Sequence, residues 1–461
     1  MIALLALLGS KLCAATGSHL EKGTIVTNAS LPGGHSSARP QPSKRVYRRR
    51  RIVVGSAIVL VLALIAAICF VVYEFNDVSN GIHRSALSGV PQNTAATNIL
   101  VMGLDSRLDE NGNALPADVY QALAAGDADD GGYNSNVLML IHIPAGGGQA
   151  VAMSIPRDDW VSLPGSPDGN SMGKIKQAYG FEMDQTLTHL VNTQPGLSHA
   201  DAYQQARAAA RQEEVTTVSQ FLGGVQIDHF IEVTLAAFYQ LAVAVQPIQV
   251  CLNEATSDRY SGANFQAGYQ DLSASQAVAF VRQRRDTSTS SFNLTDLDRD
   301  RRQQAFIVSL AVKLKSENFF TNFGLMQTLV DTAKQDIALD SGFNLFSFAS
   351  DAKHFSSGGI TFNTLPISGF GTEDGQDVNL VDLSQVQSEA AQLIAASDAS
   401  SHPTPTPTAT ASASSASAGS SGSSGSSGAA ASSASSPSAT PSNVYTSPTV
   451  PMSSGTIPCV N

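Results

Sequence analysis

The chain has 461 residues and a formal net charge of −11 at pH 7. Its first 51 residues contain nine basic side chains and one acid, so the remainder holds 18 basic and 37 acidic side chains. A domain this acidic is a poor nucleic-acid binder, because such binding depends on neutralising phosphates. We therefore expect no nucleic acid among the partners, and any anionic ligand requires a local concentration of positive charge.

The first long apolar segment spans residues 52–73. It has 22 residues and no charged side chain, which is long enough to cross a hydrocarbon core of about 30 Å. Four arginines precede it at positions 48–51, and Glu74 and Asp77 follow it. The positive-inside rule then predicts a single-pass protein of the cell membrane, with residues 1–51 as a disordered basic cytoplasmic segment and everything after residue 73 outside the cytoplasm.

Residues 74–97 are expected to form an extracytoplasmic stalk, and predicted strands and helices alternate over residues 98–396. The patterns predict strands at 98–103, 137–143, 149–154 and 230–233, and helices at 200–221, 235–245, 273–282 and 299–315. Residues 144–148 predict a hairpin turn, and the polar segment 108–132 predicts a loop. This alternation favours an α/β fold, a three-layer α-β-α domain with a central mixed sheet.

The last part of the sequence, residues 397–461, is rich in Ser, Ala, Pro and Thr. Such a segment cannot bury enough apolar surface to offset its ordering entropy, so we expect a disordered tail. Cys251 and Cys459 both lie on the predicted exported side, where disulfides persist. They could pair and fold the end of the tail back onto the domain, or remain two separate thiols, and the sequence does not decide between these outcomes.

Arginines cluster at the end of one predicted helix and the start of the next. Arg282 and Arg284 can point the same way if their segment is extended, and Arg299 and Arg302 share a helix face. Asp296 lies in the natural position to cap the second helix. Guanidinium groups suit bidentate contact with phosphate oxygens. The alternative, a solvated basic surface, is weakened by the acidity of the surrounding domain, so the cluster predicts a phosphate site.

Two other polar positions follow predicted strands. Arg157 and Asp158 come after a strand that Pro156 ends, and they could form an ordinary ion pair there. Asp105 follows the strand at 98–103, where it could hold a hard cation such as Mg²⁺ or serve only as a turn residue. Neither position predicts a site when taken alone.

Taken together and in this order, the signals resemble the LytR-CpsA-Psr family of cell-wall glycopolymer ligases. The resemblance extends over about residues 98–316. The motifs that carry it lie at residues 98–107, 134–140, 154–158, 174–179, 227–233, 277–284 and 296–304.

The resemblance implies an enzyme that moves a glycopolymer from a polyprenyl-pyrophosphate carrier onto peptidoglycan. The link would be of phosphodiester type, usually to the muramic acid 6-hydroxyl. The implied partners are the lipid-linked glycopolymer, peptidoglycan and membrane lipid. Two alternatives remain open: a polyprenyl pyrophosphate hydrolase with water as acceptor, and a non-catalytic wall-binding or regulatory membrane protein.

The resemblance also implies roles for individual residues. The catalytic residues would be Asp296, Arg157 and Arg299, with Asp105 and Asn136 as ligands of Mg²⁺ or Mn²⁺. Asn136 stands where the family usually has a carboxylate, which predicts weaker or differently placed metal binding. The pyrophosphate would be bound by Arg157, Arg282, Arg284, Arg299, Arg302 and Gln303.

Overall fold

The computed structural model describes residues 82–88, 96–287, 294–317, 337–343, 359–401 and 450–461. Within these residues an eight-stranded sheet has the order β1-β12-β7-β2-β3-β4-β13-β16. Parallel and antiparallel neighbours occur side by side, since β2 pairs in parallel with β7 and antiparallel with β3. The predicted mixed sheet is therefore confirmed. Its strands are β1 (His83–Ser85), β2 (Thr97–Leu104), β3 (Ser135–Ile143), β4 (Ala150–Ser154), β7 (His229–Thr234), β12 (Ile337–Asp340), β13 (Ile360–Thr364) and β16 (Met452–Ser453).

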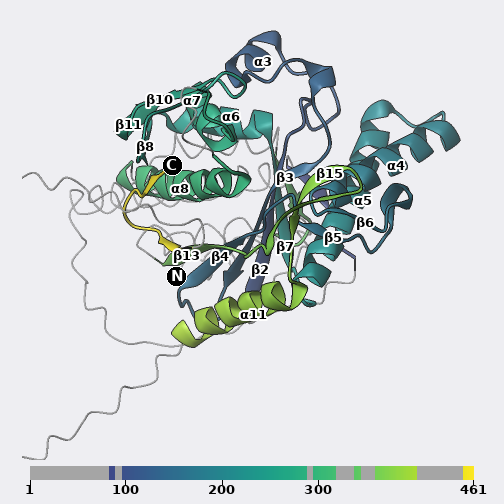
Figure 1. Ribbon diagram of the computed structural model, residues 1–461. Helices are drawn as coiled ribbons and strands as arrows, with labels where there is room; N and C mark the ends of the chain where they lie inside the picture. Colours follow the sequence, from purple (N-terminus) through teal and green to yellow (C-terminus); the bar gives the residue numbers. More distant parts are fainter. Residues whose placement is uncertain (1–81, 89–95, 288–293, 318–336, 344–358, 402–449) are drawn as a thin grey trace, which may run out of the picture. The chain divides into compact units, whose positions relative to one another are not determined.

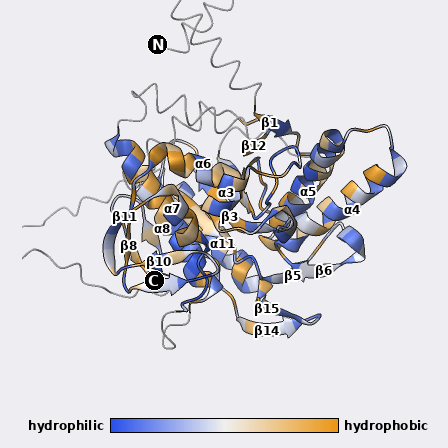
Figure 2. Ribbon diagram, turned by 90° about the horizontal axis from the view of Figure 1, so that it is seen from above, coloured by the Kyte–Doolittle hydropathy of each residue, from blue (hydrophilic) through white to orange (hydrophobic). Residues whose placement is uncertain are grey.

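Helices cover both faces of this sheet (Figure 1). One face carries α4 (Gln177–Thr193), α5 (His199–Phe221) and α11 (Leu383–Ser400), and the other carries α6 (Leu235–Val245), α7 (Ala274–Arg282) and α8 (Asp296–Ser316). Figure 2 shows α6, α7 and α8 grouped on one side and α4 and α5 on the other. Alternation along β2 explains the two cores: Leu100 and Met102 pack with α4 and α5, while Val101 packs toward α6 and α8.

Smaller elements extend the face that carries α6, α7 and α8. A three-stranded sheet has the order β11-β8-β17, and β9 pairs with β10 in a hairpin next to it. Strands β14 and β15 form a hairpin that projects from the domain beside β5 (Figure 2). The remaining elements are α3 (Ala117–Leu123), β5 (Trp160–Ser162), β6 (Met172–Lys174), β8 (Ile248–Leu252), β9 (Thr256–Asp258), β10 (Ala263–Phe265), β11 (Gly268–Leu272), β14 (Gly369–Glu373), β15 (Gln376–Leu380) and β17 (Cys459–Val460).

The structure corrects several predicted boundaries. Helix α3 lies inside the segment 108–132 that was expected to be a loop. Strand β1 lies inside the expected stalk and pairs in parallel with β12, so residues 83–85 belong to the sheet. Helix α11 continues to Ser400, beyond the predicted domain end at residue 396.

The expectation of a disordered tail is wrong for residues 450–461. Within this segment β16 pairs with β13, β17 pairs with β8, and a disulfide joins Cys251 to Cys459. The end of the tail therefore folds back onto the domain, the outcome that the two cysteines left open. Residues 402–449 lie outside the described part of the chain.

The segment predicted to cross the membrane, residues 52–73, also lies outside the described residues, as does the basic segment before it. Within the part of the chain that the structure describes, no helix combines the length and apolar character that a membrane span requires.

Candidate active site

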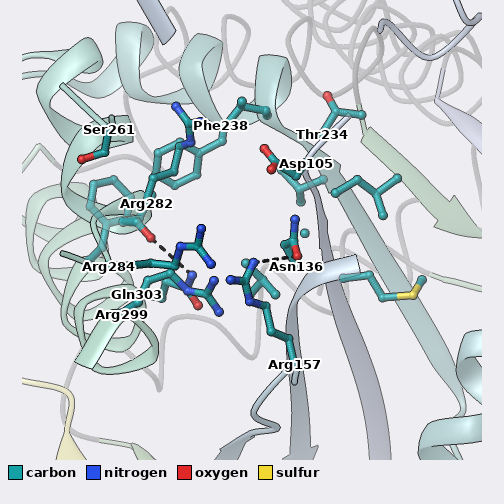
Figure 3. Close-up of a pocket in the computed structure, with 18 of the residues that line it drawn as sticks. Asp105, Asn136, Arg157, Thr234, Phe238, Ser261, Arg282, Arg284, Arg299 and Gln303 are labelled. Atoms are coloured by element: carbon teal, nitrogen blue, oxygen red, sulfur yellow. Dashed lines mark hydrogen bonds between the residues drawn. The ribbon is translucent and has the colours of Figure 1, made fainter. Parts of the chain in front are cut away.

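A cavity of about 340 Å³ lies between the sheet, at β2 and β7, and helices α6, α7 and α8. Much of its wall is apolar: Val101, Met102, Leu104, Val137, Val233, Leu235, Phe238, Leu241, Val281, Phe306, Ile307 and Leu310. Among the described residues, the arginines that line it are Arg157, Arg282, Arg284, Arg285 and Arg299. Figure 3 shows Arg284 and Arg299 reaching in from one side toward Arg157 on the other. Apolar surface and concentrated positive charge thus share one cavity.

Arg157 is fixed by contacts on two sides. It follows β4 after the buried Ile155 and is itself only 6% exposed. Its Nη1 donates to Oδ1 of Asn136 at 2.7 Å, and its Nε donates to Oδ2 of Asp296 at 3.2 Å. A second contact joins Nη2 to Oδ1 of Asp296 at 3.1 Å. Two hydrogen bonds and this ion pair together hold Arg157 at the cavity wall.

The first turn of α8 supplies the opposite arginine. Thr295, not Asp296 as predicted, caps this helix, with its side chain accepting from the backbone N–H of Asp298. Asp296 is the first helical residue, and its Oδ2 also accepts from Nη2 of Arg299 at 3.0 Å. One carboxylate therefore bridges Arg157 and Arg299 behind the cavity wall, in a position to orient both guanidinium groups.

Burial sets the electrostatics of this pair. Burial lowers the pKa of Arg157, and the neighbouring charge of Arg299 lowers it further. Burial would lower the pKa of Arg299 as well, but Asp296 and Asp300 raise it. The Asp300 carboxyl, 3.1 Å from Nη2 of Arg299, has its pKa raised by burial to about 7. Asp296 holds the two guanidinium groups together from behind, and Arg284 lines the same cavity, so the positive charge on the cavity side favours a multivalent anion.

The other predicted pyrophosphate ligands differ in how many contacts their side chains already make within the protein. Arg284 makes no hydrogen bond or ion pair with any described residue, so its guanidinium is available to a ligand. Arg282 lines the cavity but donates from Nη1 to the backbone oxygen of Leu123 at 2.7 Å. Gln303 also lines the cavity, with a long contact of 3.4 Å from Nε2 to the backbone oxygen of Val281. Arg284 is thus the least committed of the predicted phosphate ligands.

Arg302 is the predicted ligand that the structure does not bring to the cavity. It is fully buried and absent from the cavity lining. Its Nη1 donates to Oε1 of Gln283 at 2.6 Å, its Nη2 donates to Oγ1 of Thr256 at 3.2 Å, and its Nε donates to the backbone oxygen of Asn461. These acceptors hold the Arg302 guanidinium away from the cavity, so its predicted role as a pyrophosphate ligand finds no support in the geometry.

The two predicted metal ligands, Asp105 and Asn136, both line the cavity. Oδ1 of Asp105 is 2.5 Å from Nη1 of Arg107, and Asn136 already accepts from Arg157. The described residues contain no group of three or more His, Cys, Asp or Glu side chains that could hold a metal. The two oxygens fit a cation such as Mg²⁺ that takes most of its ligands from water and phosphate, and they do not fit a cage made by the protein alone.

Three groups at this cavity were given no role from the sequence, although Arg285 belongs to the same arginine cluster as Arg282 and Arg284. Arg285 lines it and lies 4.7 Å from the ring centre of Tyr260, which lines it as well. The apolar wall from α6 was predicted only as a helix. Its signal was present, because Leu235–Val245 is apolar on nearly every side, and a helix of this kind usually packs on more than one face.

The LytR_cpsA_psr family model matches residues 73–395 of the chain. The chain belongs to the LytR-CpsA-Psr family. Cell wall biosynthesis protein LcpA of Corynebacterium glutamicum is 34% identical over 342 residues, which cover 73% of this chain and 64% of LcpA. This chain therefore spans just under two thirds of that relative's length.

Two further relatives have more specific names. The polyisoprenyl-teichoic acid–peptidoglycan teichoic acid transferase TagU of Oceanobacillus iheyensis is 25% identical, over 72% of this chain and 89% of TagU. The crystal structure of Bacillus subtilis TagV is 18% identical, with a TM-score of 0.44, over 66% of this chain and 99% of that one.

This LytR-CpsA-Psr chain carries a second basic group beside the cavity. Lys176 and Lys174 place Nζ 2.6 Å and 3.2 Å from Oδ1 of Asp158, the residue after Arg157. Burial opposes ionisation of Asp158, yet Lys176 and Arg157 lower its pKa to about 2. Burial and Arg157 lower the pKa of Lys176 to about 8. The positive charge therefore extends from the cavity along β6 toward α4.

Proposed function

We propose that this protein transfers a glycopolymer from a polyprenyl-pyrophosphate carrier onto peptidoglycan, through a phosphodiester-type link to the muramic acid 6-hydroxyl. The observation that carries the proposal is a cavity in which arginines face one another next to an apolar wall. A diphosphate joined to a hydrocarbon chain has these two chemical parts. The names of LcpA and TagU support cell-wall polymer transfer as the general reaction.

In the proposed reaction the acceptor hydroxyl oxygen attacks the phosphorus that carries the sugar. The bond from that phosphorus to the bridging oxygen breaks, and polyprenyl phosphate leaves with the electron pair. Arg157, Arg284 and Arg299 would stabilise the charge that develops on the diphosphate oxygens. The hydroxyl proton would pass to a cavity carboxylate, for which we propose Asp258, because Asp105 would be held by Arg107 and the cation.

A divalent cation remains part of the proposal. Asp105 and Asn136 would hold Mg²⁺ or Mn²⁺ together with the diphosphate. When bound, the cation supplies further neutralisation of phosphate charge. Since Asn136 contributes no charge, we expect the cation to bind weakly before the donor arrives.

We also propose that residues 52–73 anchor the protein in the cell membrane, with the catalytic domain outside the cytoplasm. The Cys251–Cys459 disulfide supports this location, because disulfides persist mainly in oxidising compartments. The lipid carrier would then be presented by the same membrane that holds the anchor.

The test is in vitro transfer by the purified exported domain, given lipid-linked polymer and peptidoglycan with and without Mg²⁺. We expect a polymer–peptidoglycan conjugate, and a loss of about a hundredfold or more in rate for Arg157→Ala or Arg299→Ala. Lys313→Ala is the matched control, because it removes a positive charge from the far end of α8, where Lys313 pairs with Glu317.

Three results would contradict the proposal. Release of free polymer without a conjugate would favour the hydrolase. Binding of wall material with no turnover of the lipid donor would favour a non-catalytic role. Unchanged rates in both arginine variants would show that the cavity is not the site of reaction.

A further inference from the structure

We propose that Arg302 and residues 450–461, here called the strap, form a positioning device for the diphosphate-binding arginines, a role that rests on the function proposed above. The strap comprises β16, β17 and their flanking residues. It lies against α8 near the C label in Figure 1. Arg302 is a positioning residue and not a catalytic one, because it does not line the cavity.

Gln283 is the connection between Arg302 and the cavity. It is fully buried between Arg282 and Arg284 in the chain. Its Oε1 accepts from Nη1 of Arg302 at 2.6 Å, and its Nε2 donates to the backbone oxygen of Arg285 at 2.8 Å. Both ends of one amide side chain thus tie the arginine-bearing segment to α8.

Thr256 extends the connection to a third wall of the cavity. Its Oγ1 donates to Oε1 of Gln283 at 3.1 Å and accepts from Nη2 of Arg302 at 3.2 Å. Thr256 begins β9, and the β9–β10 turn carries Tyr260 and Ser261 to the cavity. A buried triangle of three polar side chains therefore sets the spacing of the β9–β10 turn, the segment after α7, and α8.

The strap completes this triangle from behind. The backbone oxygen of Asn461 accepts from Nε of Arg302, and the backbone oxygen of Val450 accepts from Nη1 of Arg301 at 2.5 Å. The strap is fastened to β8 by the Cys251–Cys459 disulfide and by the backbone of Asn253, which donates to Val460 at 2.8 Å. Removing the strap would leave Nε of Arg302 buried without that acceptor, which is costly.

The consequence falls on Arg284, whose guanidinium has no described partner of its own. Its position depends on the backbone that Gln283 holds. If that backbone loosens, binding must order it again, and affinity for the diphosphate falls. If the strap were merely structural, disrupting it would lower the stability of the domain but would not change the affinity of the molecules that remain folded for the lipid donor.

The experiment measures the Kd for farnesyl pyrophosphate by calorimetry, and KM and kcat for transfer, in Arg302→Met, Gln283→Leu and the double variant. We expect each single variant to bind about tenfold more weakly, and the double variant to bind no more weakly than either single one. Such non-additivity would show that Arg302 acts through Gln283. The loss should appear mainly in KM for the lipid donor.

The matched control is Met183→Ala. Met183 lies in α4, outside the strap, and is fully buried in the core on the other face of the sheet. This variant should lower the melting temperature and leave Kd unchanged. Should Arg302→Met fail to fold, reduction of the wild-type disulfide below its melting temperature gives a second measurement, with the same expected weakening.

The outcomes separate the two proposals. If the wild type neither binds farnesyl pyrophosphate nor transfers polymer, the proposed function fails and the strap's role fails with it. If the wild type binds and transfers, but folded Arg302→Met or the reduced protein keeps the wild-type Kd, the positioning role alone is overturned. A Met183→Ala variant that loses affinity as strongly as Arg302→Met would also overturn it, because lost stability would then explain the weaker binding.

Discussion

At the scale of single residues, Asp296 has an unexpected position. It bridges Arg157 and Arg299 with distances of 3.0 to 3.2 Å, yet it is not part of the cavity lining. The assignment of Asp296 as a catalytic residue stays a prediction, and its place outside the lining favours a positioning role. Its contribution is to hold two mutually repelling guanidinium groups in one geometry.

Asp296→Asn should therefore reduce kcat/KM for transfer by about a hundredfold, the typical effect of misplaced catalytic groups. The amide can still accept a hydrogen bond but cannot neutralise the two arginines. Steady-state kinetics of the variant would measure the effect, with Glu317→Gln at the exposed end of α8 as the control. Equal or faster transfer by Asp296→Asn would mean that excess positive charge, and not arginine orientation, limits the reaction.

The sequence predicted most of these residues because motif order and charge contrast are visible without coordinates. Arg157, Arg282, Arg284, Arg299 and Gln303 all reach the cavity. Arg302 was expected on the cavity side of α8 because it lies three residues after Arg299. That spacing gives a shared helix face only approximately, and α8 is buried on two sides, so Arg302 can point to either one. The choice between its two buried environments depends on Asn461, which is 159 positions away.

At the scale of elements, α4 and α5 are joined by a buried carboxyl group. Glu214 of α5 accepts at Oε2 from the backbone N–H of Tyr179 in α4 at 2.9 Å. Burial raises the pKa of Glu214 to about 8. The folded protein therefore keeps this proton between about pH 4.5 and 8, where the unfolded chain has lost it.

Because the native state binds more protons in this window, Glu214 makes the free energy of unfolding fall as pH rises from 4.5 to 8. Glu214→Gln should remove that part of the decline. The melting temperature of the variant minus that of the wild type should therefore be larger at pH 8 than at pH 5. Thermal melts of both proteins across this range would test it, with the exposed Glu389→Gln as control. Parallel curves for Glu214→Gln and wild type would contradict the assignment.

Elements were predictable where one signal dominated. The strands at residues 98–103 and 230–233 are short apolar runs, and α6 was predicted with its observed bounds. Helices α4 and α11 were not predicted, because their exposed faces are polar and their buried positions few. Helix α3 is short and lies in a segment rich in Gly and Asp, where turn signals outweigh helix propensity.

At the scale of the whole domain, the largest surprise is a cross-link between positions 208 residues apart. Cys251→Ser/Cys459→Ser should unfold more easily than the wild type by roughly 2–4 kcal/mol, the usual contribution of a native disulfide. Chemical denaturation of both proteins under oxidising conditions would measure the difference. Adding a reductant should bring the wild type to the stability of the variant, and a gap that persists in reductant would point to lost packing instead.

Composition could not predict this closure. A Ser- and Ala-rich segment has no periodic signal, and its last residues join the fold through partners that include β8, β13 and α8. Such pairing depends on contacts distant in sequence, which no local pattern contains. The two cysteines were the single hint.

The described margins of the large sheet are its shortest strands. β1 has three residues and β16 has two. Long bare edge strands invite pairing with a neighbouring copy, and short ones offer few free backbone groups. The described margins of this sheet therefore offer few backbone groups to a strand of a second copy.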